Sequence, residues 1–322
     1  MMDNTVQMTD SIPPVAMIFA AGRGRRMQPL SDVVPKPALP VPGGPVVSWA
    51  LRLVARCGVP NAVLNSWWLA QTMEESAAEA LPPELNLRFS REEHLMETAG
   101  GLALARDRGL LGTDGPVLIV NGDGILNLDL KDLFRRHHES EDLVTLGLLP
   151  HLGPELWSRV VLDRCGLVSA ILPPGTPAAG EVPLLYPGVM VIAREALDTL
   201  QTTPSGVAPA LWTPARAQAR LGGVLVSGHW REVGRTPDYL EAVMALLGDR
   251  NDVHASARVA PSAVLNQTLI GPDVTIDQEA VINQGIISHG AVIGAGARII
   301  RSVVLGDVRV EAGRTMTDEI RT

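Results

Sequence analysis

Residues 15–37 read VAMIFAAGRGRRMQPLSDVVPKP, and the beginning of this stretch decides the fold class. Val15–Ala20 is a short, continuous apolar run that ends at a glycine-bearing loop, a pattern typical of a buried parallel strand. Glycines directly after such a strand let backbone N–H groups approach phosphates closely. The stretch therefore predicts an α/β domain whose first loop can bind a phosphorylated ligand.

Strands and helices alternate along the rest of this domain. We expect helices over Pro45–Cys57, Ala70–Ala80, 98–106 and Asp129–His138. We expect strands over Ala62–Asn65, Leu85–Phe89, Val117–Val120 and Leu143–Leu149. Strand-like sequence then dominates 159–192, as an insertion, before helices over 207–220 and 236–247 flank a strand at 223–227. These elements predict an α/β fold with a Rossmann-like, mostly parallel sheet.

The sequence changes character after residue 248 and becomes repetitive. Aliphatic residues recur in steps of six, six and five, so that position 253 recurs at 270, 287 and 304, a period of 17 residues. Three short strands per turn, each with one inward aliphatic side chain, build a triangular parallel solenoid whose coils stack on one another. This pattern resembles the hexapeptide repeat of left-handed β-helices. The repeated aliphatics are Val253, Val259, Leu265, Ile270, Ile276, Ile282, Ile287, Ile293, Ile299, Val304 and Val310.

These patterns divide the chain into segments. We expect a disordered N-terminal tail over 1–14, the α/β domain over 15–247, a linker over 248–252, the β-helix over 253–313 and a tail over 314–322.

Composition limits the classes of function. The 322 residues are 46% hydrophobic and carry a net charge of −8, which does not suit a protein that coats nucleic acid or an anionic membrane. Two cysteines, Cys57 and Cys165, do not suggest a disulfide framework or a metal cluster. No signal peptide and no run of eighteen apolar residues is present, so we expect a cytoplasmic protein.

The loop after the first strand carries the residues that phosphate chemistry needs. Arginines and a lysine follow the glycines, so bidentate guanidinium groups and a point charge can join the backbone donors. The loop is not the dinucleotide fingerprint, because Met27 stands where a third glycine belongs, and it is not a P-loop. Lys36 has two interpretations. It is an ordinary surface lysine, or a lysine that prolines on both sides hold in place for a ligand.

The same loop resembles the signature of the sugar-1-phosphate nucleotidyltransferases, G-x-G-x-R-[LM]-x-P-L-[TS]-x-x-x-P-K-P. This resemblance implies that Arg26 holds the triphosphate and its developing charge and that Lys36 neutralises the reacting phosphates. It also implies that the backbone of Ala20, Ala21 and Gly22 lies against the base and ribose, with Gly24 in the same nucleotide-binding loop. The matching residues are Gly22, Gly24, Arg26, Met27, Pro29, Leu30, Ser31, Pro35, Lys36 and Pro37.

Two further segments resemble the family pattern. Glu97–Gly101 (ETAGG) is similar to a second glycine turn that contacts the nucleotide through Gly100 and Gly101, and Thr98 can also cap a helix there. The strand that ends in Asn121-Gly122-Asp123 is similar to the one that ends in the family's metal-binding aspartate. The resemblance implies that Asp123 binds Mg²⁺ and that Asn121 contacts the sugar.

The chain departs from the family at its second metal-binding position. Trp230–Pro237 is similar to a W-x-D-V-G-T-P segment, but Glu232 replaces the aspartate and Arg235 replaces the threonine. Because glutamate is one methylene longer, three arrangements stay open: a backbone that is set back, binding through water, or a weakened Mg²⁺ site. Arg235 either meets a sugar phosphate or pairs with a surface acid.

The sugar is not fixed by the sequence. Pro173-Pro174-Gly175 stands where many members carry Glu-Lys-Pro, and only Gly188 matches the strand that lines the sugar site. A β-helical tail is found in members that resemble mannose-1-phosphate guanylyltransferases, which makes such an enzyme the first expectation. A pocket without that lysine also resembles the N-acetylmuramate-1-phosphate uridylyltransferases.

We therefore expect an enzyme that takes a nucleoside triphosphate and a sugar-1-phosphate, uses Mg²⁺, and forms a homo-oligomer through the β-helix. A regulatory paralogue that binds nucleotide sugar with little turnover is the alternative, motivated by Glu232 and Arg235. An acyltransferase with His254 or His289 as its catalytic base leaves the loop after the first strand unused.

Overall fold

The computed structural model describes residues 11–151, 153, 156–176 and 182–322. The chain forms two compact units. The first comprises the chain up to Gly22, Val47–Ala70 and Ala78–Trp230, and the second comprises Arg23–Val46, Gln71–Ala77 and Arg231–Thr322. The tail predicted over 1–14 lies outside the described residues as far as residue 10. Among the described residues, no helix is both long and apolar enough to cross a membrane.

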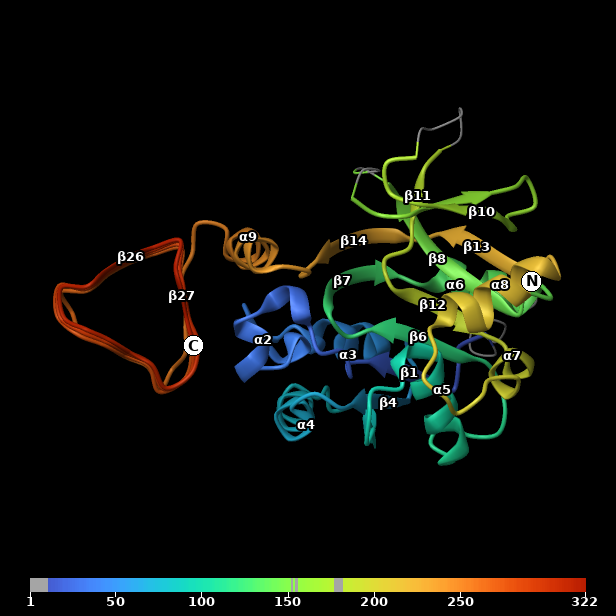
Figure 1. Ribbon diagram of the computed structural model, residues 1–322, viewed down its shortest axis with the longest axis horizontal. Coiled ribbons are helices and arrows are strands. Elements are labelled where there is room, and N and C mark those ends of the chain that lie inside the picture. Colours follow the sequence, from blue (N-terminus) through green and yellow to red (C-terminus); the bar gives the residue numbers. More distant parts are fainter. Residues whose placement is uncertain (1–10, 152, 154–155, 177–181) are drawn as a thin grey trace, which may run out of the picture. The chain divides into compact units, whose positions relative to one another are not determined.

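A mixed sheet forms the centre of the first unit (Figure 1). Its strand order is β10-β9-β11-β8-β12-β6-β1-β4-β5, and β13 pairs with β8. The neighbours β6, β1, β4 and β5 are parallel, so their carboxyl ends meet at one edge of the sheet. The bounds are β1 Val15–Phe19, β4 Asn61–Ser66, β5 Asn86–Arg91, β6 Val117–Asn121, β8 Val144–Pro150, β9 Arg159–Leu162, β10 Val168–Leu172, β11 Leu184–Leu185, β12 Val189–Ile192 and β13 Leu221–Leu225.

Helices pack against this sheet by their apolar faces. α3 (Val47–Arg56) contacts β1, α5 (Glu97–Asp107) contacts β4 and β5, and α6 (Lys131–Glu139) contacts β8 and β13. The β1 side chains are all buried, as expected of a central strand. The predicted α/β fold is therefore confirmed. The other helices of the first unit are α7 Arg194–Asp198, the π-helix η3 Ala208–Trp212 and α8 Thr213–Ala217, whereas most of α4 (Ala70–Glu79) belongs to the second unit.

The strands of the first unit and their pairing differ from the sequence-based expectation in three respects. Residues 184–192 form two strands, β11 and β12, because Pro187 and Gly188 interrupt the extended run. The strand expected at 223–227 is β13, which begins and ends two residues earlier. A further two-stranded sheet pairs β7 (Gly124–Asp129) with β14 (Ser227–Glu232), neither of which was predicted.

The second unit contains the loop after β1 together with the C-terminal part of the chain. The loop forms η1 (Arg25–Met27), α2 (Leu30–Val33) and η2 (Lys36–Ala38), then the short strands β2 (Pro40–Val41) and β3 (Gly44–Pro45). The Tyr239 hydroxyl of α9 (Thr236–Leu247) donates to the Pro40 carbonyl at 2.6 Å. The Gly43 amide donates to Asp252 at 3.3 Å. These contacts join the loop to the helix and to the first coil of the repeat, across the predicted linker at 248–252.

The C-terminal repeat is a parallel β-helix whose coils outline a triangle in Figure 1. Strands on each side pair at an offset of 17 residues, as in Val253–Ile270–Ile287–Val304, which confirms the predicted period. Its sides are β15-β18-β21-β24-β27, β16-β19-β22-β25 and β17-β20-β23-β26. The bounds are β15 Asp252–Val253, β16 Arg258–Val259, β17 Val264–Asn266, β18 Leu269–Ile270, β19 Thr275–Ile276, β20 Val281–Asn283, β21 Ile286–Ile287, β22 Val292–Ile293, β23 Arg298–Ile300, β24 Val303–Val304, β25 Arg309–Val310, β26 Thr315–Thr317 and β27 Ile320–Arg321.

The β-helix continues into the segment expected to be a C-terminal tail, 314–322. Met316 is fully buried on top of Ile299, and β27 pairs with β24. The prediction ended too early because Met316 is not among the branched aliphatics that mark the repeat. In the first coil, by contrast, Val253 is 40% exposed because no described coil precedes it.

A buried polar cluster fastens α6 to the sheet. His137 Nδ1 lies 2.8 Å from the Thr145 hydroxyl, which donates to Asp142 at 3.1 Å. Arg136 donates to the same carboxylate at 3.1 Å. Burial lowers the pKa of His137 to about 4, and this outweighs the nearby negative charge of Asp142.

This cluster predicts an acid-sensitive fold. Since the pKa of His137 is about 4 in the folded protein and 6.5 in an unstructured chain, the unfolded protein takes up the proton first as the pH falls. The stabilising contribution is complete above pH 6.5 and is lost as the pH falls towards 4. We expect the free energy of unfolding to drop by about 1–2 kcal/mol between pH 7 and 5 from this group alone. Urea unfolding of wild type and His137→Gln measures it, and equal pH dependence in both proteins would contradict the assignment.

Candidate active site

The predicted site residues fall into two groups, one in each compact unit. Arg26, Lys36 and Glu232 belong to the second unit, together with Gly24. The remaining predicted residues belong to the first unit: Ala20, Ala21, Gly22, Gly100, Gly101, Asn121, Asp123 and Gly188.

Lys36 is built into the loop that follows β1. It begins the 3-10 helix η2, and the whole residue is only 6% exposed. Gly24 lies opposite, with φ at +66°, and a Cβ added there would be 3.2 Å from the Lys36 Cβ. Glycine at position 24 is thus required both by the left-handed backbone and by the close approach of the lysine. Of the two interpretations of Lys36, the structure excludes the ordinary surface lysine.

Arg26 and Glu232 face each other. Arg26 Nη2 lies 3.3 Å from Glu232 Oε1, although the two residues are far apart in sequence. The Arg26 side chain is 69% exposed, so solvent screens this ion pair and the guanidinium can still reach a ligand. The pairing places the arginine of the signature loop beside the glutamate that stands at the second metal-binding position.

The structure decides between the two predicted roles of Arg235, contact with a sugar phosphate and pairing with a surface acid. Its Nε and Nη2 atoms donate to the two carboxylate oxygens of Asp238, both at 3.1 Å, across the first turn of α9. The geometry is bidentate, which fixes the guanidinium more firmly than a single hydrogen bond does. Arg235 therefore pairs with a surface acid.

The nucleotide loop begins at the carboxyl end of β1. The Ala20 amide donates to Asn65 Oδ1 at 2.8 Å, and Asn65 belongs to the neighbouring parallel strand β4. Ala20 and Ala21 are buried, whereas Gly22 is exposed and a Cβ there would meet no atom within 4 Å. A hydrogen bond thus fixes the start of the loop, whereas its first glycine is accessible to solvent.

The second glycine turn packs closely against other parts of the first unit. A Cβ on Gly100 would be 2.3 Å from the Thr203 carbonyl oxygen, and one on Gly101 would be 2.6 Å from Glu92 Oε1. The Thr98 hydroxyl accepts a hydrogen bond from the Val207 amide at 2.9 Å, so it does not cap its own helix α5. Packing alone requires glycine at both positions, whatever else the turn contacts.

Asp123, Asn121 and Gly188 lie together at the end of β6. Asp123 is half-buried in the turn between β6 and β7. The backbone N–H of Asn121 donates to the Gly188 carbonyl at 2.8 Å. A Cβ on Gly188 would be 2.7 Å from the Asn121 side chain. The structure therefore brings the two predicted sugar contacts next to each other, close in sequence to the predicted metal ligand.

A closed metal cage is absent from the part of the chain that the structure describes, where no three His, Cys, Asp or Glu side chains gather around one point. The two predicted metal ligands are single carboxylates, one in each unit. Mg²⁺ usually takes one or two carboxylates and completes its shell with water and substrate phosphates. Asp123 and Glu232 supply oxygen ligands of that kind.

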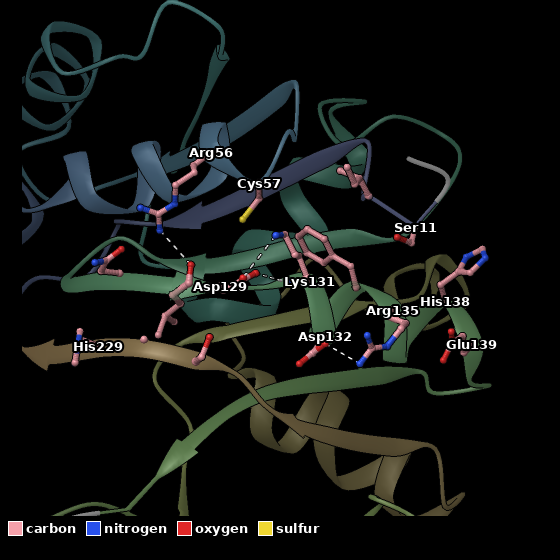
Figure 2. Close-up of a pocket in the computed structure, with 16 residues that line it drawn as sticks. Ser11, Arg56, Cys57, Asp129, Lys131, Asp132, Arg135, His138, Glu139 and His229 are labelled. Atoms are coloured by element: carbon pink, nitrogen blue, oxygen red, sulfur yellow. Dashed lines mark hydrogen bonds and ion pairs between the residues drawn. The ribbon is translucent and has the colours of Figure 1, made fainter. Parts of the chain in front are cut away.

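A separate cavity of about 1290 Å³ lies in the first unit, next to α6 (Figure 2). Ion pairs join the charges on its wall, at 3.9 Å between Lys131 and Asp129 and at 2.7 Å between Arg135 and Asp132. Arg56 donates to the Leu128 carbonyl at 3.1 Å. None of the predicted site residues lines this cavity, so we assign no part of the reaction to it.

Two buried polar residues beside the nucleotide loop were not predicted. Asn65 donates to Glu92 Oε1 at 2.8 Å, and Glu92 Oε2 accepts from the Met96 amide at 2.9 Å. Burial raises the pKa of Glu92, against the lowering effect of these hydrogen bonds. Asn65 is the last residue of a predicted strand, the position at which α/β sheets bind ligands, whereas Glu92 lies three residues beyond the strand predicted over Leu85–Phe89 and directly after the observed β5.

Comparison with known proteins identifies the family of the chain. Residues 15–248 match the family model described as nucleotidyl transferase. The chain is 28% identical to the mannose-1-phosphate guanylyltransferase of Mycobacterium tuberculosis, over 92% of this chain and 81% of the relative. It is 33% identical to the N-acetylmuramate alpha-1-phosphate uridylyltransferase of Neisseria meningitidis, over 72% of this chain and 98% of the relative. The family model covers well over half of the sequence, and the chain therefore belongs to the nucleotidyl transferase family.

Proposed function

We propose that this protein transfers a nucleoside monophosphate from a nucleoside triphosphate to a sugar-1-phosphate and releases pyrophosphate. The observation that carries the proposal is the loop after β1, in which Gly24, Lys36 and Arg26 stand as in the family signature. The names of the relatives, one a guanylyltransferase and one a uridylyltransferase, agree on this type of reaction.

The proposed chemistry is an in-line displacement in which a phosphate oxygen of the sugar-1-phosphate attacks the α-phosphorus. The nucleophile is already anionic, so the protein has to position and neutralise charge rather than remove a proton. Arg26 binds the triphosphate through its guanidinium fork, and Lys36 supplies a point charge at the reacting phosphates. Asn121 and Gly188 hold the sugar. Mg²⁺, bound by Asp123 and Glu232, would screen the phosphate charges.

Two pairs of substrates compete for this site. A guanosine nucleotide with mannose-1-phosphate is favoured because similarity to the M. tuberculosis relative extends over 92% of the chain, β-helix included. A uridine nucleotide with N-acetylmuramate-1-phosphate is favoured by the higher identity, 33%, to a relative that aligns with only 72% of the chain. The first pair is our proposal, because it accounts for both parts of the chain.

The separate roles of the two parts of the chain are also a proposal. Residues 15–247 would carry the reaction, and the β-helix predicted over 253–313 would join subunits of a homo-oligomer. The strands β15 and β27 stand at the two ends of one side of the β-helix, where backbone groups can pair with another chain.

Pyrophosphate release tests the function directly. The full-length protein is assayed with Mg²⁺ across the common nucleoside triphosphates and sugar-1-phosphates. Turnover of one pair establishes the reaction and names both substrates. Binding of a nucleotide sugar without turnover of any pair would instead favour the regulatory paralogue, in which the Arg26–Glu232 ion pair persists in place of a metal site.

A further inference from the structure

A continuous chain of hydrogen bonds crosses the carboxyl edge of the sheet in the first unit. It runs from the Ala20 amide to Asn65 Oδ1, from Asn65 Nδ2 to Glu92 Oε1, and from the Met96 amide to Glu92 Oε2. The three distances are 2.8, 2.8 and 2.9 Å. This hydrogen-bond network thus joins the ends of β1, β4 and β5 to Met96, the residue that precedes α5.

The two side chains in the middle are almost inaccessible to water. Asn65 is 2% exposed and Glu92 is 4% exposed. Gly101 lies against both, since a Cβ there would be 2.6 Å from Glu92 Oε1 and 3.0 Å from Asn65 Nδ2. Water therefore cannot replace a lost partner without a rearrangement of the turn that contains Gly100 and Gly101.

When the carboxyl groups are ionised, the polarity of this hydrogen-bond network allows only two combinations of side chains with these shapes. Both ends are backbone N–H donors, so each middle residue must turn an acceptor outwards, and one donor must lie between the two residues. Asparagine at 65 with glutamate at 92 meets this condition, and so does aspartate at 65 with glutamine at 92. Two amides leave one donor facing a donor, and two carboxylates leave two acceptors in contact.

We propose that Asn65 and Glu92 are positioning residues for the nucleotide. They fix the Ala20–Gly22 backbone relative to the turn that holds Gly100 and Gly101, so that both segments can contact the same ligand. Neither side chain needs to touch substrate. The inference rests on the proposed function only where it names a nucleotide as the ligand.

The proposal can be tested by exchanging the carboxamide at position 65 and the carboxylate at position 92. Asn65→Asp and Glu92→Gln each break one contact, and the double variant restores all three. We expect each single variant to raise the KM for the nucleoside triphosphate by about 10–100-fold, by analogy with the loss seen when the hydrogen-bond partners of metal ligands are removed. The KM for the sugar-1-phosphate should change much less. The double variant should return to within about threefold of wild type, which a double-mutant cycle expresses as coupling.

Matched controls make the same chemical changes next to the network. Asn61→Asp alters the other end of β4, where the side chain donates to the Pro14 carbonyl, and Glu93→Gln alters an exposed neighbour of Glu92. Both should leave the KM of the triphosphate unchanged. Folded single variants with a wild-type KM, or a double variant as impaired as the two singles combined, would overturn the proposal.

Hydrogen exchange of the wild-type protein gives a second test that needs neither variants nor substrate. The amides of Ala20 and Met96 should exchange as slowly as the neighbouring strand amides. Exchange at the rate of an open loop would refute the network. If no triphosphate is bound or turned over but these amides are protected and the double variant regains thermal stability, the proposed function fails while the network stands.

Discussion

Replacing Arg26 by alanine is expected to lower kcat/KM by about 10²–10³ with little effect on folding. The side chain is 69% exposed and its ion pair with Glu232 is screened by solvent, so little stability depends on it. In the proposed reaction, however, the guanidinium faces charge that grows on the triphosphate, and loss of one such group removes about 3–4 kcal/mol of transition-state stabilisation. Steady-state pyrophosphate release measures the effect.

Arg25 provides the matched control, because it is an exposed arginine in the same short helix η1. Arg25→Ala should keep kcat/KM within a few-fold of wild type. Arg26→Lys should fall between alanine and wild type, since an ammonium keeps the charge and loses the bidentate fork. A wild-type rate in Arg26→Ala would remove Arg26 from the proposed catalytic residues.

Asp123→Asn is expected to reduce turnover by about 10²–10⁴ and to raise the Mg²⁺ concentration needed for half-maximal rate. The substitution keeps the shape of the side chain in the turn after β6 and removes its charge. A divalent metal contributes several kcal/mol of charge stabilisation in such reactions, and each ~1.36 kcal/mol corresponds to a factor of ten in rate. Titration of the rate with Mg²⁺ separates weaker metal binding from slower chemistry.

Asp129→Asn is the corresponding control at the other end of β7, where the carboxylate lies 3.9 Å from Lys131. It should alter neither the rate nor the Mg²⁺ dependence. If Asp123→Asn titrated with Mg²⁺ like wild type, the predicted metal ligand would have to be sought elsewhere.

The parts of the fold that could be predicted are those whose pattern is local. Each coil of the β-helix repeats the same inward aliphatic positions, and α9 lies at 236–247 as expected because Pro237 and Gly248 mark its ends. The pair β7–β14 could not be predicted, because about a hundred residues separate its two strands and the alternation in Gly124–Asp129 extends over only its last four residues.

The same distinction applies to the candidate site. The motif around Gly24 and Lys36 was visible because its residues are close in sequence, and the structure adds the close contact between them. The position of Asn65 at the end of a strand was visible, but its role and that of Glu92 were missed, because they depend on contacts with each other and with backbone amides far away in the sequence. The pairing of Arg26 with Glu232 likewise depends on a tertiary contact across 206 positions.

The 17-residue register of the β-helix determines which changes in chain length its coils can accommodate. β18 and β21 pair at an offset of 17, so inserting or deleting one residue within such a strand exchanges its inward and outward positions. A duplication of 17 codons within 270–303 would instead add one complete coil and keep both neighbours in register. This part of the gene can therefore lengthen by whole coils, whereas single-codon insertions and deletions at inward-facing positions should be eliminated by selection.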